Sequence, residues 1–133
     1  MDVQILTLCD FAEDFVGKMC ITGTFDTLRV ADLERNLSNF SIAARIAFDQ
    51  GESGRQEFSI AIKNDEGKDH VPELKGFLDI KERKSFMGAS NLVLNLNGIS
   101  FARPGLYFVV LKMNGALLKS IPFAVEGPQR PHS

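Results

Sequence analysis

Side chains that could carry out nucleophilic catalysis are scarce in this sequence. A serine or cysteine nucleophile needs a histidine base that an acidic side chain orients, and the 133-residue chain contains only two histidines. His70 lies just before Pro72 in a turn-like segment, and His132 lies close to the end of the sequence. We expect both imidazoles to be solvated, and we predict that the protein has no catalytic residues and is not an enzyme.

Metal-binding patterns are equally sparse. Cys9 and Cys20 do not form a Cys-x-x-Cys pair, which is the spacing typical of structural zinc sites, and we expect both to be free, mostly buried thiols. The acidic segments 49–52 and 65–69 contain carboxylates that could bind calcium, but neither follows the twelve-residue calcium-loop pattern. We expect solvated turns there, no bound metal and no cofactor.

Charge and hydropathy argue against two further classes of partner. The formal net charge of −2 produces no field that would attract nucleic acid or an anionic membrane, and the basic stretch 81–84 is interrupted by Glu82. No segment has the basic start of a signal peptide or the length of a membrane span. We therefore expect a cytoplasmic protein that binds neither nucleic acid nor a membrane.

The elements that must position any site are β-strands. Apolar and polar residues alternate with a period of two over 40–48, 58–62 and 92–96, which is typical of antiparallel strands with one buried and one wet face. Together with similar stretches elsewhere, the sequence contains about eight short strands separated by turn signals. This pattern predicts an all-β, antiparallel β-sandwich or a small barrel. Residues 1–125 form the single expected domain, and 126–133 form an expected flexible tail.

Three stretches are assigned from weaker patterns. We predict a strand over 3–9, followed by a loop or a single helical turn over 10–17. Leu33 and Leu37 are four residues apart, and this spacing favours one short amphipathic helix near 31–38. The asparagines of the 92–96 strand and its flanks could form a polar ladder for sugar hydroxyls, but without an aromatic platform we expect a hydrated sheet face; these are Asn91, Asn95 and Asn97.

The clearest single signal is a hairpin over 104–125. Two apolar runs flank Asn114-Gly115, a dipeptide that suits a two-residue type I′ turn. With that loop, the predicted cross-strand partners are Lys112 and Leu117, Val110 and Lys119, Phe108 and Ile121, and Leu106 and Phe123.

Both faces of the first hairpin strand are apolar, so one face needs a cover beyond the core. Cover from the same chain, such as the 28–38 segment, is one possibility. The sharper hypothesis is an interface with a protein partner or a second copy through Leu106, Phe108, Val110 and Ile121.

Several short motifs together resemble a known family. They are Leu8-Cys9-Asp10, Gly17-Lys18, Gly23-Thr24-Phe25-Asp26, Pro104-Gly105-Leu106-Tyr107, Asn114-Gly115 and Pro122-Phe123-Ala124-Val125. The chain resembles an uncharacterised bacterial domain-of-unknown-function family of short all-β proteins with immunoglobulin-like or transthyretin-like sandwiches. The resemblance implies a sandwich fold and offers no catalytic residues. By analogy with such sandwiches, Tyr107 would be a corner tyrosine whose hydroxyl bonds to backbone across a turn.

These observations favour a non-catalytic protein that acts through protein–protein contact or self-association as a homo-oligomer. The alternative is a sandwich that binds a small ligand or a carbohydrate with loops at one end, for which the loops around Asp10, 49–55 and 65–70 are the candidates. An enzyme is the third and least favoured class.

Overall fold

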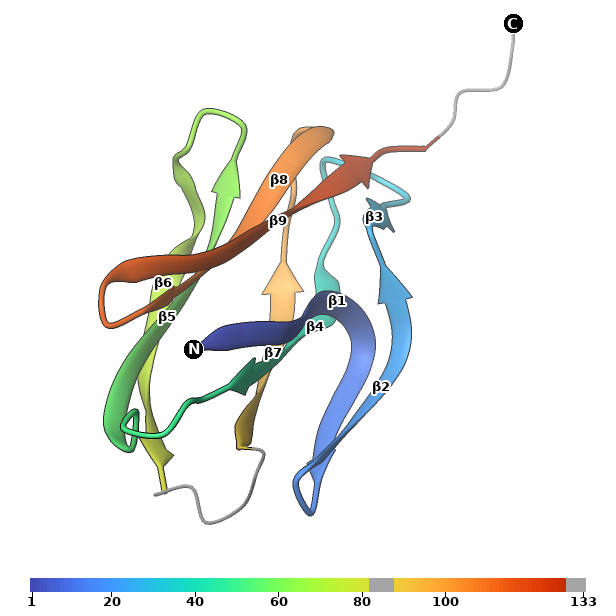
Figure 1. The fold of residues 1–133 in the computed structure, drawn as a ribbon. Helices are drawn as coiled ribbons and strands as arrows, with labels where there is room; N and C mark the ends of the chain where they lie inside the picture. Colours follow the sequence, from blue (N-terminus) through green and yellow to red (C-terminus); the bar gives the residue numbers. More distant parts are fainter. Residues whose placement is uncertain (82–87, 129–133) are drawn as a thin grey trace, which may run out of the picture.

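The computed structural model describes residues 1–81 and 88–128, and the chain forms β-structure throughout this part. Nine strands lie in two sheets, and no helix occurs among the described residues. The prediction of an all-β fold is therefore confirmed. The two sheets are visible in Figure 1, where the larger one curls into a half-barrel.

The four-stranded sheet is fully antiparallel. In spatial order it contains β2 (Lys18–Phe25), β1 (Asp2–Phe15), β4 (Ser38–Ala47) and β7 (Ala89–Ile99). β4 is its best-covered strand because apolar residues fill its inner face and small residues fill most of its outer face, so Ile42, Ala43 and Ala44 are all inaccessible to solvent.

The five-stranded sheet joins distant parts of the chain. In spatial order it contains β3 (Thr27–Arg29), β9 (Ala116–Glu126), β8 (Gly105–Met113), β5 (Gly54–Asn64) and β6 (Asp69–Ile80). Its strands are antiparallel except that the short β3 runs parallel to β9.

The main hydrophobic core draws its side chains from both sheets, as the period-two alternation requires. Leu8, Phe40, Ile42 and Ile46 of the first sheet belong to the same cluster as residues of β5, β8 and β9 in the second. Aromatic rings are prominent among the buried side chains; they include Phe40, Phe58, Phe101, Tyr107 and Phe123.

The predicted loop over 10–17 is wrong, because β1 continues unbroken to Phe15. Its first half pairs with β4 and its second half pairs with β2, with Phe15 opposite Lys18. Acidic residues in 10–14 weakened the strand signal in the sequence, but pairing with β2 determines the conformation. The turn is only Val16 and Gly17.

The predicted helix near 31–38 is also wrong; residues 31–37 form bends, and Ser38 already belongs to β4. The side chain of Asn36 donates to the carbonyl oxygens of Leu33 (3.1 Å) and Phe101 (3.0 Å), and it accepts from the N–H of Phe101 (3.1 Å). Such side-chain bonds to backbone groups compete with helix formation. Leu33 packs against the core, whereas Leu37 is exposed.

The β8–β9 hairpin has the predicted turn, with φ of 52° at Asn114 and 82° at Gly115. Lys112 pairs with Leu117 as expected, but a register shift follows between Leu111 and Lys112. The other predicted pairs are therefore wrong by one residue. The observed partners are Leu111 and Lys119, Val110 and Ser120, Val109 and Ile121, Phe108 and Pro122, Tyr107 and Phe123, and Leu106 and Ala124.

Some expectations fall on residues that the structure does not describe. They are the stretch 82–84 of the predicted basic turn, and 129–133 of the predicted tail, which includes His132. In the described part, no helix is long and apolar enough to cross a membrane.

Candidate functional site

The predicted interface residues do not share one surface. Val110 is only 9% exposed and Phe108 is half-buried, whereas Leu106 is 45% exposed. Ile121 lies opposite Val109 and packs against the main core, because the register shift turns it to the inner face of the sheet. The structure brings together Leu106, Phe108 and Val110 on the outer face of β8 and separates Ile121 from them.

A more apolar surface lies on the β1–β2 hairpin. Phe11 and Phe15 are 55% and 61% exposed, and Val16 at the turn is 88% exposed. They supply three of the eight large hydrophobic residues that are exposed in the described part of the chain. We call Phe11, Phe15 and Val16 the hairpin surface. The sequence analysis missed it because 10–17 was assigned as a loop, although Gly17-Lys18 marked the turn.

The opposite side of this hairpin lies against the four-stranded sheet. Ala12 is buried in a small second cluster with Cys9 and Ala43, and Met19 and Ile21 of β2 pack against that cluster. Ala43 lies on the outer face of β4, because its neighbours Ile42 and Ala44 belong to the main core. The hairpin therefore folds over the outer face of its own sheet, and Figure 1 shows the strong bend of β1 that allows this.

Polar contacts fix the tip of the hairpin. Asn91 donates to the Asp14 carboxylate (2.7 Å) and to the Gly17 carbonyl (3.2 Å), and Arg45 donates to the same carbonyl (3.1 Å). Arg45 also donates to the side-chain oxygen of Asn91 (2.6 Å). The hairpin surface is consequently held in one position relative to the rest of the molecule.

The turn itself is strained. Val16 has a φ of 53°, a left-handed conformation that is a real outlier for a β-branched residue. The turn of the β8–β9 hairpin has asparagine at the same position, where asparagine is the favoured residue. An apolar, solvent-exposed residue thus occupies a backbone position that a polar residue would adopt more easily.

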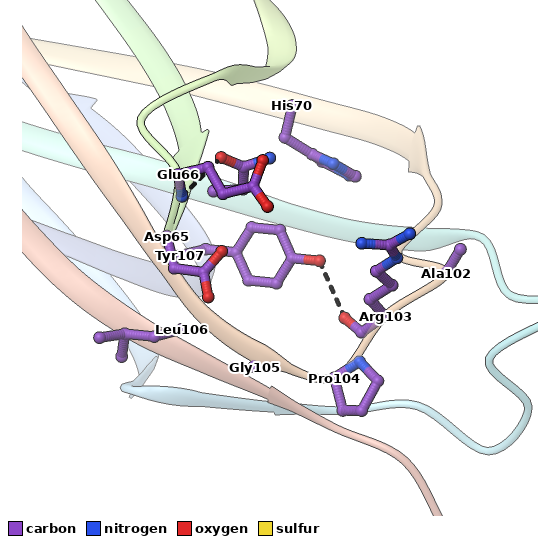
Figure 2. A pocket seen from close by; sticks show the side chains of 10 residues that line it. Asp65, Glu66, His70, Ala102, Arg103, Pro104, Gly105, Leu106 and Tyr107 are labelled. Atoms are coloured by element: carbon purple, nitrogen blue, oxygen red, sulfur yellow. Dashed lines mark hydrogen bonds between the residues drawn. The ribbon is translucent and has the colours of Figure 1, made fainter.

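A pocket of about 340 Å³ lies at the other end of the molecule, between the β5–β6 turn and the segment that leads into β8. Figure 2 shows the side chains around it. They are Asn64, Asp65, Glu66, His70, Ala102, Arg103, Pro104, Gly105, Leu106 and Tyr107.

Aromatic stacking forms one wall of this pocket. The His70 ring stacks on the fully buried ring of Phe101 with centroids 4.6 Å apart and planes 10° apart, and it meets Tyr107 edge-to-face at 5.2 Å. The expectation that His70 is a plainly solvated side chain is wrong. Its Nε2 lies 2.7 Å from the Ser100 carbonyl oxygen; because a carbonyl only accepts, Nε2 carries a hydrogen and donates it.

Tyr107 behaves as the predicted corner tyrosine. Its hydroxyl donates to the backbone carbonyl of Arg103 at 2.8 Å, as the dashed line in Figure 2 marks. Burial raises the pKa of this hydroxyl; the negative charge of Asp65 adds to the rise and the positive charge of Arg103 opposes it. The two charged side chains thus both act on the Tyr107 hydroxyl.

Several carboxylates of the acidic segments that could have bound calcium are engaged with basic groups. Asp69 pairs with Lys63 at 3.2 Å, Glu66 with Lys68 at 3.6 Å, and Glu52 with the amino terminus at 2.9 Å. Within residues 1–81 and 88–128, no three histidine, cysteine or acidic side chains gather in a way that would hold a metal ion.

The asparagines of β7 do not form a shared ladder. Asn95 accepts a hydrogen bond from Ser41 at 2.7 Å, and Asn91 holds the hairpin tip. Cys9 and Cys20 are free thiols as predicted, but only Cys9 is buried, since Cys20 lies on the exposed side of β2.

The fold and these sites define a small all-β, two-sheet protein with an exposed apolar hairpin surface and a polar pocket. The chain belongs to a family of unknown function, DUF6941, whose family model matches residues 4–126. This confirms the expected membership of an uncharacterised family.

No curated protein matches the sequence. Among solved structures, the chain is similar to the Pseudomonas fluorescens alkylpurine DNA glycosylase AlkC bound to DNA containing an abasic site analog, with 10% identity and a TM-score of 0.46. The match covers 94% of this chain and 30% of the glycosylase chain, so this chain spans less than a third of that protein. Similarity at this level carries no argument about function.

Proposed function

We propose that this protein is a non-catalytic, immunoglobulin-like β-sandwich that self-associates through the β1–β2 hairpin. The observation that carries the proposal is the hairpin surface, because Phe11, Phe15 and Val16 expose large apolar side chains on one hairpin whose tip is held by hydrogen bonds. Concentrated apolar surface of this kind is typical of protein contact sites.

The edge strand beside this surface supports a second copy of the chain as the partner. β2 is the end strand of its sheet, and no described strand pairs with its far side. Unpaired backbone groups along an edge strand are a template for another strand. Antiparallel pairing of β2 with β2 of a second copy would extend the sheet and place two hairpin surfaces side by side.

The other sheet edges are less suited to pairing. β3 has only three residues, and β6 contains Pro72 and pairs irregularly with β5; short length, proline and bulges are the usual protections of an edge. β7 is long, but it carries none of the large hydrophobic residues that are exposed in the described part of the chain. β6 exposes Leu74 and Phe77 but carries these protections, whereas β2 combines an open edge with the adjoining hairpin surface and contains no proline.

The experiment is sedimentation equilibrium of the wild type and of the double variant Phe11→Ser, Phe15→Ser. We expect a wild-type dimer whose dissociation constant rises at least about thirtyfold in the variant, since removing central interface aromatics typically costs 2 kcal/mol or more. Amide exchange along β2 should also slow as the wild-type concentration increases, because pairing protects edge N–H groups.

The matched controls separate this surface from the outer face of β8. Leu106→Ser and Phe108→Asp remove apolar side chains there, and the proposal requires both variants to retain the wild-type dissociation constant. A monomeric wild type at all concentrations refutes self-association. Dissociation caused by Phe108→Asp but not by the hairpin variant moves the interface to the β8 face.

A further inference from the structure

The pocket between the β5–β6 turn and the start of β8 contains opposite charges that do not pair with one another. No ion pair joins Arg103 or Asp65 to any other residue of the described chain. In Figure 2 the Arg103 guanidinium lies beyond the hydroxyl end of the Tyr107 ring, the Asp65 carboxylate lies near the opposite end, and the Glu66 carboxylate lies above the ring in this view, towards His70. The pocket therefore presents a cation at one end and carboxylates at the other end and along its side.

Hydrogen bonding and ring stacking anchor the backbone from which the Arg103 side chain extends. The corner bond from the Tyr107 hydroxyl holds the Arg103 backbone, and the stack of His70 on Phe101 holds the ring beside it. Pre-organisation of this kind reduces the entropy that a ligand loses on binding. A planar guanidinium is well suited to a carboxylate because it can donate two parallel hydrogen bonds.

The opposite end of the pocket suits an ammonium group. Glu66 has Lys68 as a partner at 3.6 Å, but Asp65 has none in the described part of the chain. The backbone of the turn that carries both carboxylates is fixed by Asn64, whose side-chain oxygen accepts from the N–H groups of Glu66 (3.0 Å) and Lys68 (2.9 Å). An ammonium group has three donors that match these carboxylate oxygens.

We infer that this pocket binds a small zwitterion of dipeptide size, with its carboxylate on Arg103 and its ammonium group on Asp65 and Glu66. The volume of about 340 Å³ falls in the range of small-molecule sites and would hold roughly ten water molecules at liquid density. The Tyr107 ring supplies the apolar surface between Arg103 and Asp65. The pocket lies far from the β1–β2 turn in Figure 1, so the inference stands independently of self-association.

The probe is glycylglycine, and the measurement is the change in backbone amide chemical shifts of the full chain. Two blocked analogues each lack one charge: N-acetylglycylglycine has only the carboxylate, and glycylglycine amide has only the ammonium group. We expect glycylglycine to shift the amides of 64–70 and 102–107, and each analogue to bind at least about tenfold more weakly, as expected for the loss of one charged hydrogen-bonding group.

Two variants locate the contacts. Arg103→Gln should weaken glycylglycine binding at least about tenfold while leaving the affinity for glycylglycine amide unchanged. Asp65→Asn should likewise weaken glycylglycine binding, but it should leave the affinity for N-acetylglycylglycine unchanged. The controls are Arg55→Gln and Asp79→Asn, which make the same charge changes on β5 and β6 away from the pocket. Both control variants should bind as the wild type does.

Three results would overturn the inference. Equal binding of glycylglycine and N-acetylglycylglycine would reduce the pocket to an anion site, and equal binding of glycylglycine and its amide would reduce it to a cation site. No shift in the pocket amides at about 20 mM glycylglycine, which exceeds a millimolar dissociation constant, would show that the pocket does not take this class of ligand.

Discussion

Val16 combines a strained backbone conformation with an exposed apolar side chain. A left-handed conformation costs a non-glycine residue about 1–2 kcal/mol, and Val16 bears this cost at a φ of 53° while its side chain is almost fully in solvent. Folding gains nothing from an apolar side chain in water. Strain of this kind is informative when it coincides with a proposed contact surface.

Val16→Asn is therefore expected to stabilise the monomer and weaken its association. We expect the free energy of unfolding to rise by about 1 kcal/mol, because asparagine tolerates positive φ. Urea unfolding, carried out in the Phe11→Ser, Phe15→Ser background to remove any contribution from dimers, measures this gain. Val16→Ala serves as the control, since alanine removes the apolar side chain but keeps an unfavourable backbone conformation. Equal stability of the two variants would exclude backbone strain as the cause.

Among the elements, the 31–37 segment shows why local patterns misassign irregular structure. The spacing of Leu33 and Leu37 suggested a helix, yet only Leu33 packs against the core. Asn36 links this segment to Phe101, which is 65 residues away in the sequence. A contact at such separation leaves no periodic signal, so sequence analysis could not find it. The alternation of β4, β5 and β7 was readable because large apolar residues occupy one face of each strand and mostly small or polar residues occupy the other.

The Asn36→Ala variant should test the importance of this link. It leaves the N–H and carbonyl groups of Phe101 without their partner, and we expect a loss of about 2 kcal/mol because unsatisfied backbone groups are costly. Urea denaturation gives the value. Asn97→Ala, an exposed position on β7, is the control and should change stability by less than about 0.5 kcal/mol. A similar loss in both variants would contradict the role assigned to Asn36.

At the scale of the whole molecule, the two thiols should react with a disulfide reagent at different rates. Cys9 is fully buried, and burial raises its pKa, so at a given pH less of it is thiolate, the reactive form. We expect one thiol per chain to react rapidly with a disulfide reagent at neutral pH, and the second to react only at the rate of opening of the fold. Loss of the fast phase in Cys20→Ser identifies the exposed thiol, whereas a fast phase that persists would place Cys9 within reach of solvent.

The candidate sites also depend on contacts between segments that lie far apart in the sequence. The sequence analysis proposed loops at one end as an alternative ligand site, and 65–70 does line the pocket, but Arg103 comes from a segment more than thirty residues later. Only the pairing of β5 with both β6 and β8 brings these two segments together. Tyr107 was identified beforehand because a corner tyrosine depends on a local turn. The hairpin surface depends on the path of β1, which the acidic residues of 10–14 obscured.

The position of β9 has a consequence for synthesis on the ribosome. β9 is the last strand in sequence, yet it lies between β8 and β3 in its sheet. Phe123 and Val125 fill the main core from this strand. A growing chain therefore cannot close its core until residue 126 has emerged, and β3 has no partner in the sheet before then. We therefore expect the main core to be completed only after β9 has left the ribosome, even though every other strand of the described chain has emerged before it.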